Sequence, residues 1–174
     1  ITKEGCMACH HSPENTQCAR CHQKQSALFT AENLPVKLPE AKPSVKAGKV
    51  ECVNCHDLSK KQTIENIAPA CIGCHDKAYV DILNGWKQET LESQKKTRDM
   101  LESAGRKLND VRKAKRDVSQ AAGLLDQAKK AYEFVVRANG VHNADLAGAI
   151  LEQVRRDARK AEELLESPGV KREK

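Results

Sequence analysis

The residues with the most distinctive chemistry are eight cysteines, which form four pairs, each followed directly by a histidine. The motifs are Cys6-Met-Ala-Cys9-His10, Cys18-Ala-Arg-Cys21-His22, Cys52-Val-Asn-Cys55-His56 and Cys71-Ile-Gly-Cys74-His75. C-x-x-C-H is the attachment signature of c-type haem. Thiols at this spacing reach the two vinyl groups of one porphyrin, and the adjacent imidazole binds the iron as proximal ligand. The sequence therefore predicts four covalently attached haems c.

Three other kinds of site use cysteine pairs. Paired C-x-x-C units build zinc sites, and the first two pairs have nearly the spacing of a zinc ribbon. An even number of cysteines also suits a disulfide framework, and a single C-x-x-C suits a thiol redox site. None of these alternatives requires a histidine after every second cysteine, so the haem interpretation is favoured.

The composition of residues 1–76 agrees with bound haem. This region holds all eight cysteines, contains few large apolar side chains and is interrupted by five of the six prolines. Such a chain buries too little apolar surface to offset the entropy of ordering it. Four porphyrins would supply that surface. We therefore expect a haem-packed, loop-rich region that is unfolded without its haems.

Charge and hydropathy exclude other classes of protein. The formal net charge is +6, but basic and acidic residues are interspersed, which is not typical of a nucleic-acid-binding protein. No run of 18 apolar residues is present, so no transmembrane segment is expected. The sequence shows no export leader at its start. Either a signal has been removed or residue 1 lies within a longer cytochrome.

Four irons need eight axial ligands, and the motifs supply four of them. His11 follows His10 directly, so its side chain points away from its own haem and can bind the iron of a neighbour. His142 is the only histidine in the last 98 residues and lies at a break between two helical stretches. We predict that both are distal ligands. The remaining positions are left to Met7, Met100, a lysine, the amine of Ile1, water or another chain, or they are open.

The chain divides into two predicted regions, a tetrahaem-binding region at 1–78 and a helical region at 79–174. Within the first, haem-binding segments at 1–25 and 50–76 are expected to have short helical turns after each motif. The proline-rich stretch 34–43 between them is expected to be an extended connector draped over the haem pairs. Little in the sequence favours β-strands, so the predicted fold class is mainly α.

No proline occurs between residues 80 and 166, and apolar residues there recur at steps of three and four. This pattern predicts three helices, at about 84–114, 117–138 and 144–166, arranged as an antiparallel hairpin or bundle. The stretch 112–117 is either a turn or a solvated helix face. Asn139-Gly140 is a helix stop. The same apolar stripes could also join two copies of the chain in a homodimer.

The four motifs and the Cys9-His10-His11 start resemble the small bacterial multihaem cytochromes of class III. That resemblance implies that His11 ligates a neighbouring haem. The stretch from Ala131 to His142-Asn143, with the helix that follows, is similar to the C-terminal helices of ammonia-forming cytochrome c nitrite reductases and related octahaem reductases. It implies that His142 is a distal ligand and that the long helices form a dimer interface.

The second resemblance has one clear departure. Those nitrite reductases carry a catalytic haem whose motif ends in lysine, whereas all four motifs here end in histidine. Nitrite reduction is therefore not implied. The sequence predicts a tetrahaem cytochrome that transfers electrons between redox protein partners in the periplasm or outside the cell. The alternatives are a reductase of a small nitrogen or sulfur oxyanion at an under-ligated haem, and a haem-based gas or redox sensor.

Overall fold

The computed structural model describes residues 18–167, and the prediction of a mainly α fold is confirmed for them. No β-strand occurs between these two residues. The elements in chain order are η1 (Cys18–Arg20), α2 (Gln23–Thr30), η2 (Cys52–Asn54), α3 (Ile64–Ile72), α4 (Ala78–Lys113), α5 (Ser119–Ala138), η3 (Gly140–His142) and α6 (Ala144–Glu166). No helix in this part of the chain has both the length and the apolar character needed to cross a membrane.

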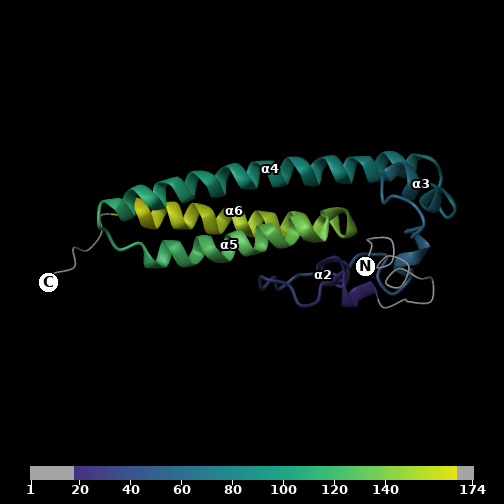
Figure 1. Ribbon diagram of the computed structural model, residues 1–174, viewed down its shortest axis with the longest axis horizontal. Helices are drawn as coiled ribbons and strands as arrows, with labels where there is room; N and C mark the ends of the chain where they lie inside the picture. Colours follow the sequence, from purple (N-terminus) through teal and green to yellow (C-terminus); the bar gives the residue numbers. More distant parts are fainter. Residues whose placement is uncertain (1–17, 168–174) are drawn as a thin grey trace, which may run out of the picture.

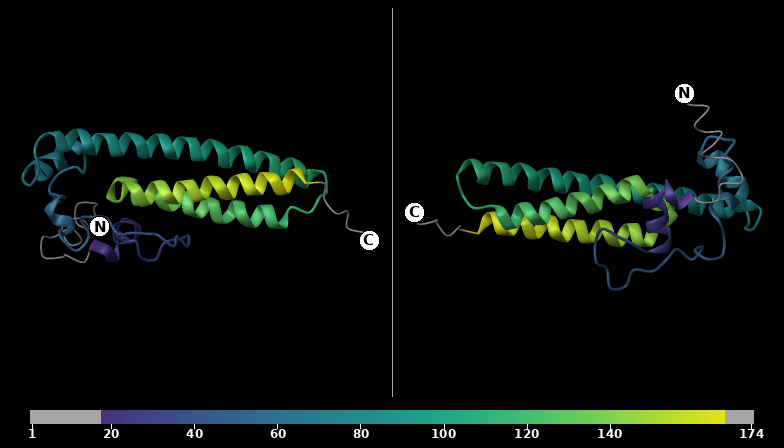
Figure 2. Two further views of the ribbon diagram at one scale, coloured as in Figure 1. Left: turned by 180° about the vertical axis from the view of Figure 1, so that it is seen from behind. Right: turned by 60° about the horizontal axis from the view of Figure 1, so that its bottom comes forward.

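The three long helices α4, α5 and α6 lie side by side, and each contacts the other two. Figure 1 shows α3, which leads into the fourth motif, at one end of these helices and the C-terminal end of α6 at the other. The first turns of α4 extend past the start of α6 toward the motifs, which both views of Figure 2 also show. α4 therefore belongs to the helical core at one end and to the motif region at the other.

An aspartate precedes each of two of these helices and binds a backbone N–H at its start. α4 begins at Ala78 rather than near residue 84, and Asp76 Oδ1 accepts a hydrogen bond from the Ala78 N–H at 2.9 Å. The stretch 112–117 ends α4 and turns the chain. Asp117 Oδ1 then accepts from the Ser119 N–H at 3.0 Å at the start of α5. Of the two interpretations of this stretch, the structure shows the turn.

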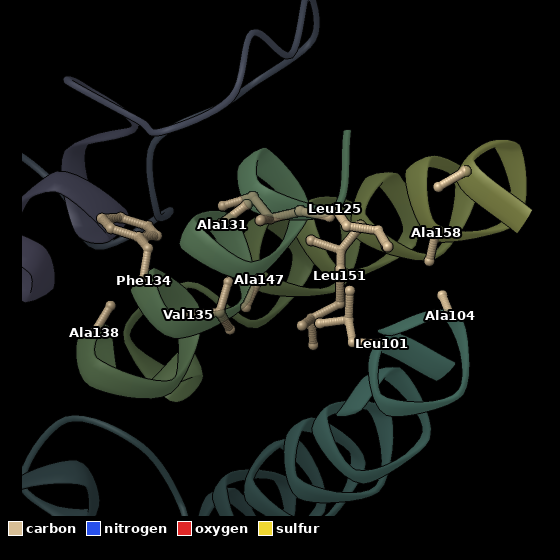
Figure 3. Packing of buried hydrophobic residues seen from close by; sticks show 14 of the residues in the cluster. Leu101, Ala104, Leu125, Ala131, Phe134, Val135, Ala138, Ala147, Leu151 and Ala158 are labelled. Atoms are coloured by element: carbon tan, nitrogen blue, oxygen red, sulfur yellow. The ribbon is translucent and has the colours of Figure 1, made fainter. Parts of the chain in front are cut away.

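The core of the long helices is built largely from alanine and branched aliphatic side chains. Figure 3 shows Leu101 and Ala104 of α4 facing Leu151 and Ala158 of α6. Alanines on α5 and α6 are almost fully buried, and small side chains let helix axes approach closely. The residues with no exposed surface include Val135, Ile150, Leu151 and Val154. Burial of this stripe, rather than helix propensity, stabilises the long helices.

The segment after the second motif packs against this same core. Leu28 of α2 is fully buried in it, and Leu34, Val36, Leu38 and Ala41 of the proline-rich stretch are partly buried against it. These residues pack against the helical core, and the expectation that they also drape over the haem pairs stays a prediction. A short helix, α2, follows the second motif as expected, whereas a turn follows the third motif and the long helix α4 follows the fourth.

A polar contact joins α4 to α6 within the helical core. Arg155 Nη1 donates to Ser93 Oγ at 3.0 Å and to Thr97 Oγ1 at 2.8 Å, and Thr97 is fully buried. The other side of the guanidinium donates to Glu152, which lowers the pKa of that carboxyl. Because every partner must align for these bonds to form, the contact fixes the register of α6 on α4.

Candidate haem-binding site

The three cysteine motifs between residues 18 and 75 adopt the same helical turn. In each, the histidine N–H donates to the carbonyl of the first cysteine at 2.9 Å, and the N–H of the second cysteine donates to that carbonyl at 3.2 Å. Residues spaced three and four apart share one face of a helical turn. Both thiols and the imidazole of each motif are therefore presented on one side. The first motif, with Cys6, Cys9, His10 and the adjoining His11, lies outside the described residues.

The three described motifs lie close enough together for their thiols to influence one another. Burial raises the pKa of Cys52, and the nearby Cys18 thiol raises it further. Burial likewise raises the pKa of Cys55, with a further contribution from Cys71. The motifs are separated by up to about fifty residues of sequence, yet the fold brings them to one end of the molecule.

The arrangement of the described thiols does not favour the other kinds of cysteine site. All six are free, with none joined in a disulfide. The raised pKa values of Cys52 and Cys55 keep these thiols protonated, whereas metal binding and thiol exchange use the thiolate. Within residues 18–167, no three or more histidine, cysteine or acidic side chains are grouped so as to hold a metal ion by themselves.

His142 lies in the short helix η3, at the N-terminal end of α6. Its Nδ1 atom is 2.9 Å from the carbonyl oxygens of both Ala138 and Asn139, so Nδ1 carries the proton and donates it. Burial lowers the pKa of the ring and favours the neutral imidazole. Metal-binding histidines are held in this way, with one ring nitrogen donating to a carbonyl and the other binding the metal. Nε2 is therefore the ring atom that would be available to bind a metal.

His56 is held in the same tautomer by a side-chain amide. Its Nδ1 lies 2.6 Å from Gln62 Oε1. The amide nitrogen of Gln62 donates to the carbonyls of Asp57 and Lys60, at 2.7 and 2.8 Å, so the amide oxygen must face the imidazole. Nδ1 of His56 therefore donates, and Nε2 is the atom that can bind iron.

The rings of His56 and His142 are neighbours. Their centroids are 6.0 Å apart and their planes are inclined by 30°. A metal–imidazole bond of about 2.0 Å, and about 1.1 Å from the nitrogen to the ring centre, place the centroids of two imidazoles on one metal about 6.2 Å apart. The observed centroid spacing is close to that value. Sequence reasoning identified each histidine but did not pair them.

A cavity of about 670 Å³ lies beside His142, within the usual range for small-molecule and cofactor sites. Its walls come from the connector residues 38–46, from Trp86 of α4 and from residues 141–146. Lys46 lines it with its ammonium group 5.0 Å from the centre of the Trp86 ring, a cation–π contact. The walls are largely apolar, and both basic side chains (Lys42, Lys46) and acidic ones (Glu40, Asp145) line the cavity.

Asn143 fixes the position of the residue before it. Its amide nitrogen donates to the carbonyls of Leu28 at 3.2 Å and Lys42 at 3.0 Å, and its Oδ1 accepts from the Leu146 N–H at 3.2 Å. One buried side chain thus starts α6 and ties it to α2 and to the connector. The sequence indicated only a helix start here, because the two carbonyl partners lie more than a hundred residues away.

The other two described motif histidines lie on the surface. His22 is exposed and immediately precedes α2. His75 is also exposed, and its ring stacks on that of Tyr79. Met100, one of the further ligand candidates, lies half-buried on α4. The described histidine pair at a potential iron position is therefore His56 with His142.

Comparison of the chain with protein-family models, with curated proteins and with solved structures gives no match in any of the three. The case for a function therefore depends on the motifs and on the geometry described above.

Proposed function

We propose that this chain is a tetrahaem c-type cytochrome that transfers electrons between redox protein partners outside the cytoplasm. The single observation that carries the proposal is the spacing of His56 and His142, two imidazoles whose centroids lie 6.0 Å apart, close to the separation expected for two ligands of one iron. His56 belongs to a C-x-x-C-H motif, and His142 does not. A proximal and a distal ligand are therefore supplied from opposite parts of the chain.

The residues present fit a covalently bound haem. The cysteines of each motif would form the two thioether bonds, and the following histidine would bind the iron. When bound, haem supplies a one-electron couple between ferric and ferrous iron. The Nδ1–H of His56 and of His142 would stay hydrogen-bonded, which orients both rings and tunes the basicity of Nε2.

Exposed apolar side chains support the same assignment. Residues with more than about a third of their surface exposed include Val45, Val50, Val53 and Ile72, all of them in or beside the motif-bearing segments. Clustered exposed apolar residues mark a binding surface. Porphyrin rings at the motifs would cover this surface, as the composition of the region predicts.

Electron transfer is favoured over substrate chemistry because an iron held by two imidazoles has no open position. The convergence of three motifs at one end of the long helices would also keep their haems close together, which suits hopping between them. Haem c attachment takes place on exported chains, and this supports a location in the periplasm or outside the cell. The homodimer expected through the C-terminal helices remains a prediction.

Replacement of His142 by alanine tests the proposal in the purified, haem-loaded protein. We expect intact mass and pyridine haemochrome spectra to give four haems in both the variant and the unaltered protein. H142A should convert one low-spin haem to a high-spin form that binds carbon monoxide, and added imidazole should restore the low-spin spectrum. The substitution N109A, at an exposed position on α4, should leave every haem unchanged.

Two results would contradict the proposal. A colourless protein, or one with fewer than four added macrocycles, would remove the tetrahaem assignment. An unchanged low-spin spectrum in H142A would remove the histidine pair. Turnover of nitrite or a sulfur oxyanion by the unaltered protein, at a haem that binds carbon monoxide, would instead establish a reductase.

A further inference from the structure

The imidazole of His75 is held by a different kind of contact from those of His56 and His142. Among the described residues, no hydrogen bond fixes the His75 ring, whereas Nδ1 of each of the other two donates to an oxygen. Instead, the His75 ring lies face to face with that of Tyr79, with centroids 3.9 Å apart and planes inclined by only 10°. This stack is the contact that sets the plane of the imidazole.

The Tyr79 ring is itself fixed at the start of α4. Asp76, next to His75, accepts hydrogen bonds from the Ala78 N–H through its side chain and from the Tyr79 N–H through its carbonyl, at 2.9 and 3.1 Å. The motif therefore leads into α4 without a flexible link. Since α4 continues into the buried core of the long helices, the helix that carries Tyr79 is anchored at its far end.

A second aromatic ring supports Tyr79 from the side. Trp86, further along α4, meets Tyr79 edge-on, with centroids 6.0 Å apart and planes at 90°. This is one of the favoured geometries for two aromatic rings. Trp86 in turn carries the ammonium group of Lys46 over its face at 5.0 Å. Tyr79 is thus held between Trp86 and the imidazole, and it has little freedom to turn.

We propose that Tyr79 is a positioning residue, which fixes the rotation of the His75 imidazole about its bond to the haem iron of the fourth motif. The proposal rests on the proposed function, because it needs a haem on Cys71, Cys74 and His75. The orientation of an axial imidazole against the porphyrin nitrogens sets the g values of a low-spin ferric haem. Tyr79 therefore determines the electron paramagnetic resonance (EPR) signature of one haem of the four and leaves the other three unaffected.

The test compares two substitutions of Tyr79 with a matched change at the other tyrosine. Y79F keeps the ring and removes the hydroxyl, Y79L removes the ring, and Y132L removes a half-buried ring on α5. EPR spectra of the oxidised, haem-loaded proteins are recorded after haem stoichiometry has been measured. We expect Y79L to shift the g values of one low-spin signal, and Y79F and Y132L to reproduce the unaltered spectrum.

The outcomes separate the positioning role from the haem assignment. Four haems with an unchanged spectrum in Y79L would overturn the role of Tyr79 and leave the cytochrome proposal intact. A shift in Y79F as large as that in Y79L would also overturn it, because the ring would then not be the cause. If Y79L does not retain four haems, W86L decides, since it removes the ring that supports Tyr79 and should move the same signal. Because Trp86 also lines the cavity beside His142, the signal that H142A changes is identified first, and a shift confined to that signal overturns the role of Tyr79. Absence of haem from the unaltered protein would refute the proposed function itself.

Discussion

Replacing Asn143 by alanine is expected to loosen the attachment of the N-terminal segments to the long helices. This side chain makes three hydrogen bonds to three different segments, namely α2, the connector and the first turn of α6. N143A removes all three bonds and leaves two carbonyls, of Leu28 and Lys42, without that donor. The change is confined to one buried amide, so its effect can be calculated from the contacts that disappear.

The expected loss in the free energy of unfolding is about 3 kcal/mol. Loss of an N-cap side chain costs about 1 kcal/mol. Each buried carbonyl that loses its partner adds roughly another 1 kcal/mol. N143S retains a hydroxyl that can cap α6 but lacks the two amide donors, so it should cost about 2 kcal/mol. N109A makes the same replacement at an exposed position on α4 and should change stability by less than about 0.5 kcal/mol.

Guanidinium unfolding of the haem-loaded protein, followed by far-ultraviolet circular dichroism, measures these differences. We expect the order of stability to be N109A, then N143S, then N143A. A second readout is the low-spin signal of the haem bound by His142, which should broaden in N143A because its loop is no longer held. If N143A and N109A unfold at the same denaturant concentration, the three hydrogen bonds do not join these segments in solution and the reasoning is refuted.

Three further substitutions test the packing and the charge of the long helices. A Cβ added at Gly140 would lie 2.4 Å from Thr90 Cγ2, so G140A should cost about 1–3 kcal/mol. G148A, where nothing lies within 4 Å, should stabilise α6 by about 0.5–1 kcal/mol, and equal effects of the two substitutions in thermal melts would contradict this. Hydrogen bonds from Arg155 hold the pKa of Glu152 below its ordinary 4.5, so the stabilisation that this carboxylate provides is present above pH 4.5 and is lost as the pH falls through the lowered pKa. E152Q should therefore be less stable than the unaltered protein at pH 7, and the difference should shrink as the pH falls below 4.5; a difference that does not depend on pH would exclude the carboxylate as its source.

The ends of the long helices could be predicted from sequence because the signals that set them are local. α5 ends at Ala138, as predicted, directly before the helix stop Asn139-Gly140. α6 spans the predicted 144–166. The start of α4 was predicted too late: Asp76, whose carboxylate accepts from the Ala78 N–H, directly follows the fourth motif and lies in the segment 50–76 that was expected to bind haem. Pro69 shows the opposite case, since a residue expected to interrupt structure lies inside α3.

What the sequence could not supply are contacts between distant segments. The prolines of the connector 34–43 indicated an extended chain. They did not indicate that its apolar side chains pack against the long helices. His142 was predicted to be a ligand because it is the only histidine in the last 98 residues. That its ring lies beside the ring of His56 is known only from the folded structure. The stack of Tyr79 on His75 spans only four residues, yet it depends on how the motif turn enters α4.

On the proposed function, the length of α4 would separate an end that exchanges electrons from a distant end that does not. At 1.5 Å per residue its 36 residues extend about 54 Å. A protein that exchanges electrons with haems at the described motifs would therefore have to approach beside those motifs. The opposite tip, where α4 turns into α5, would then be a place at which the protein could be tethered without interfering with electron transfer.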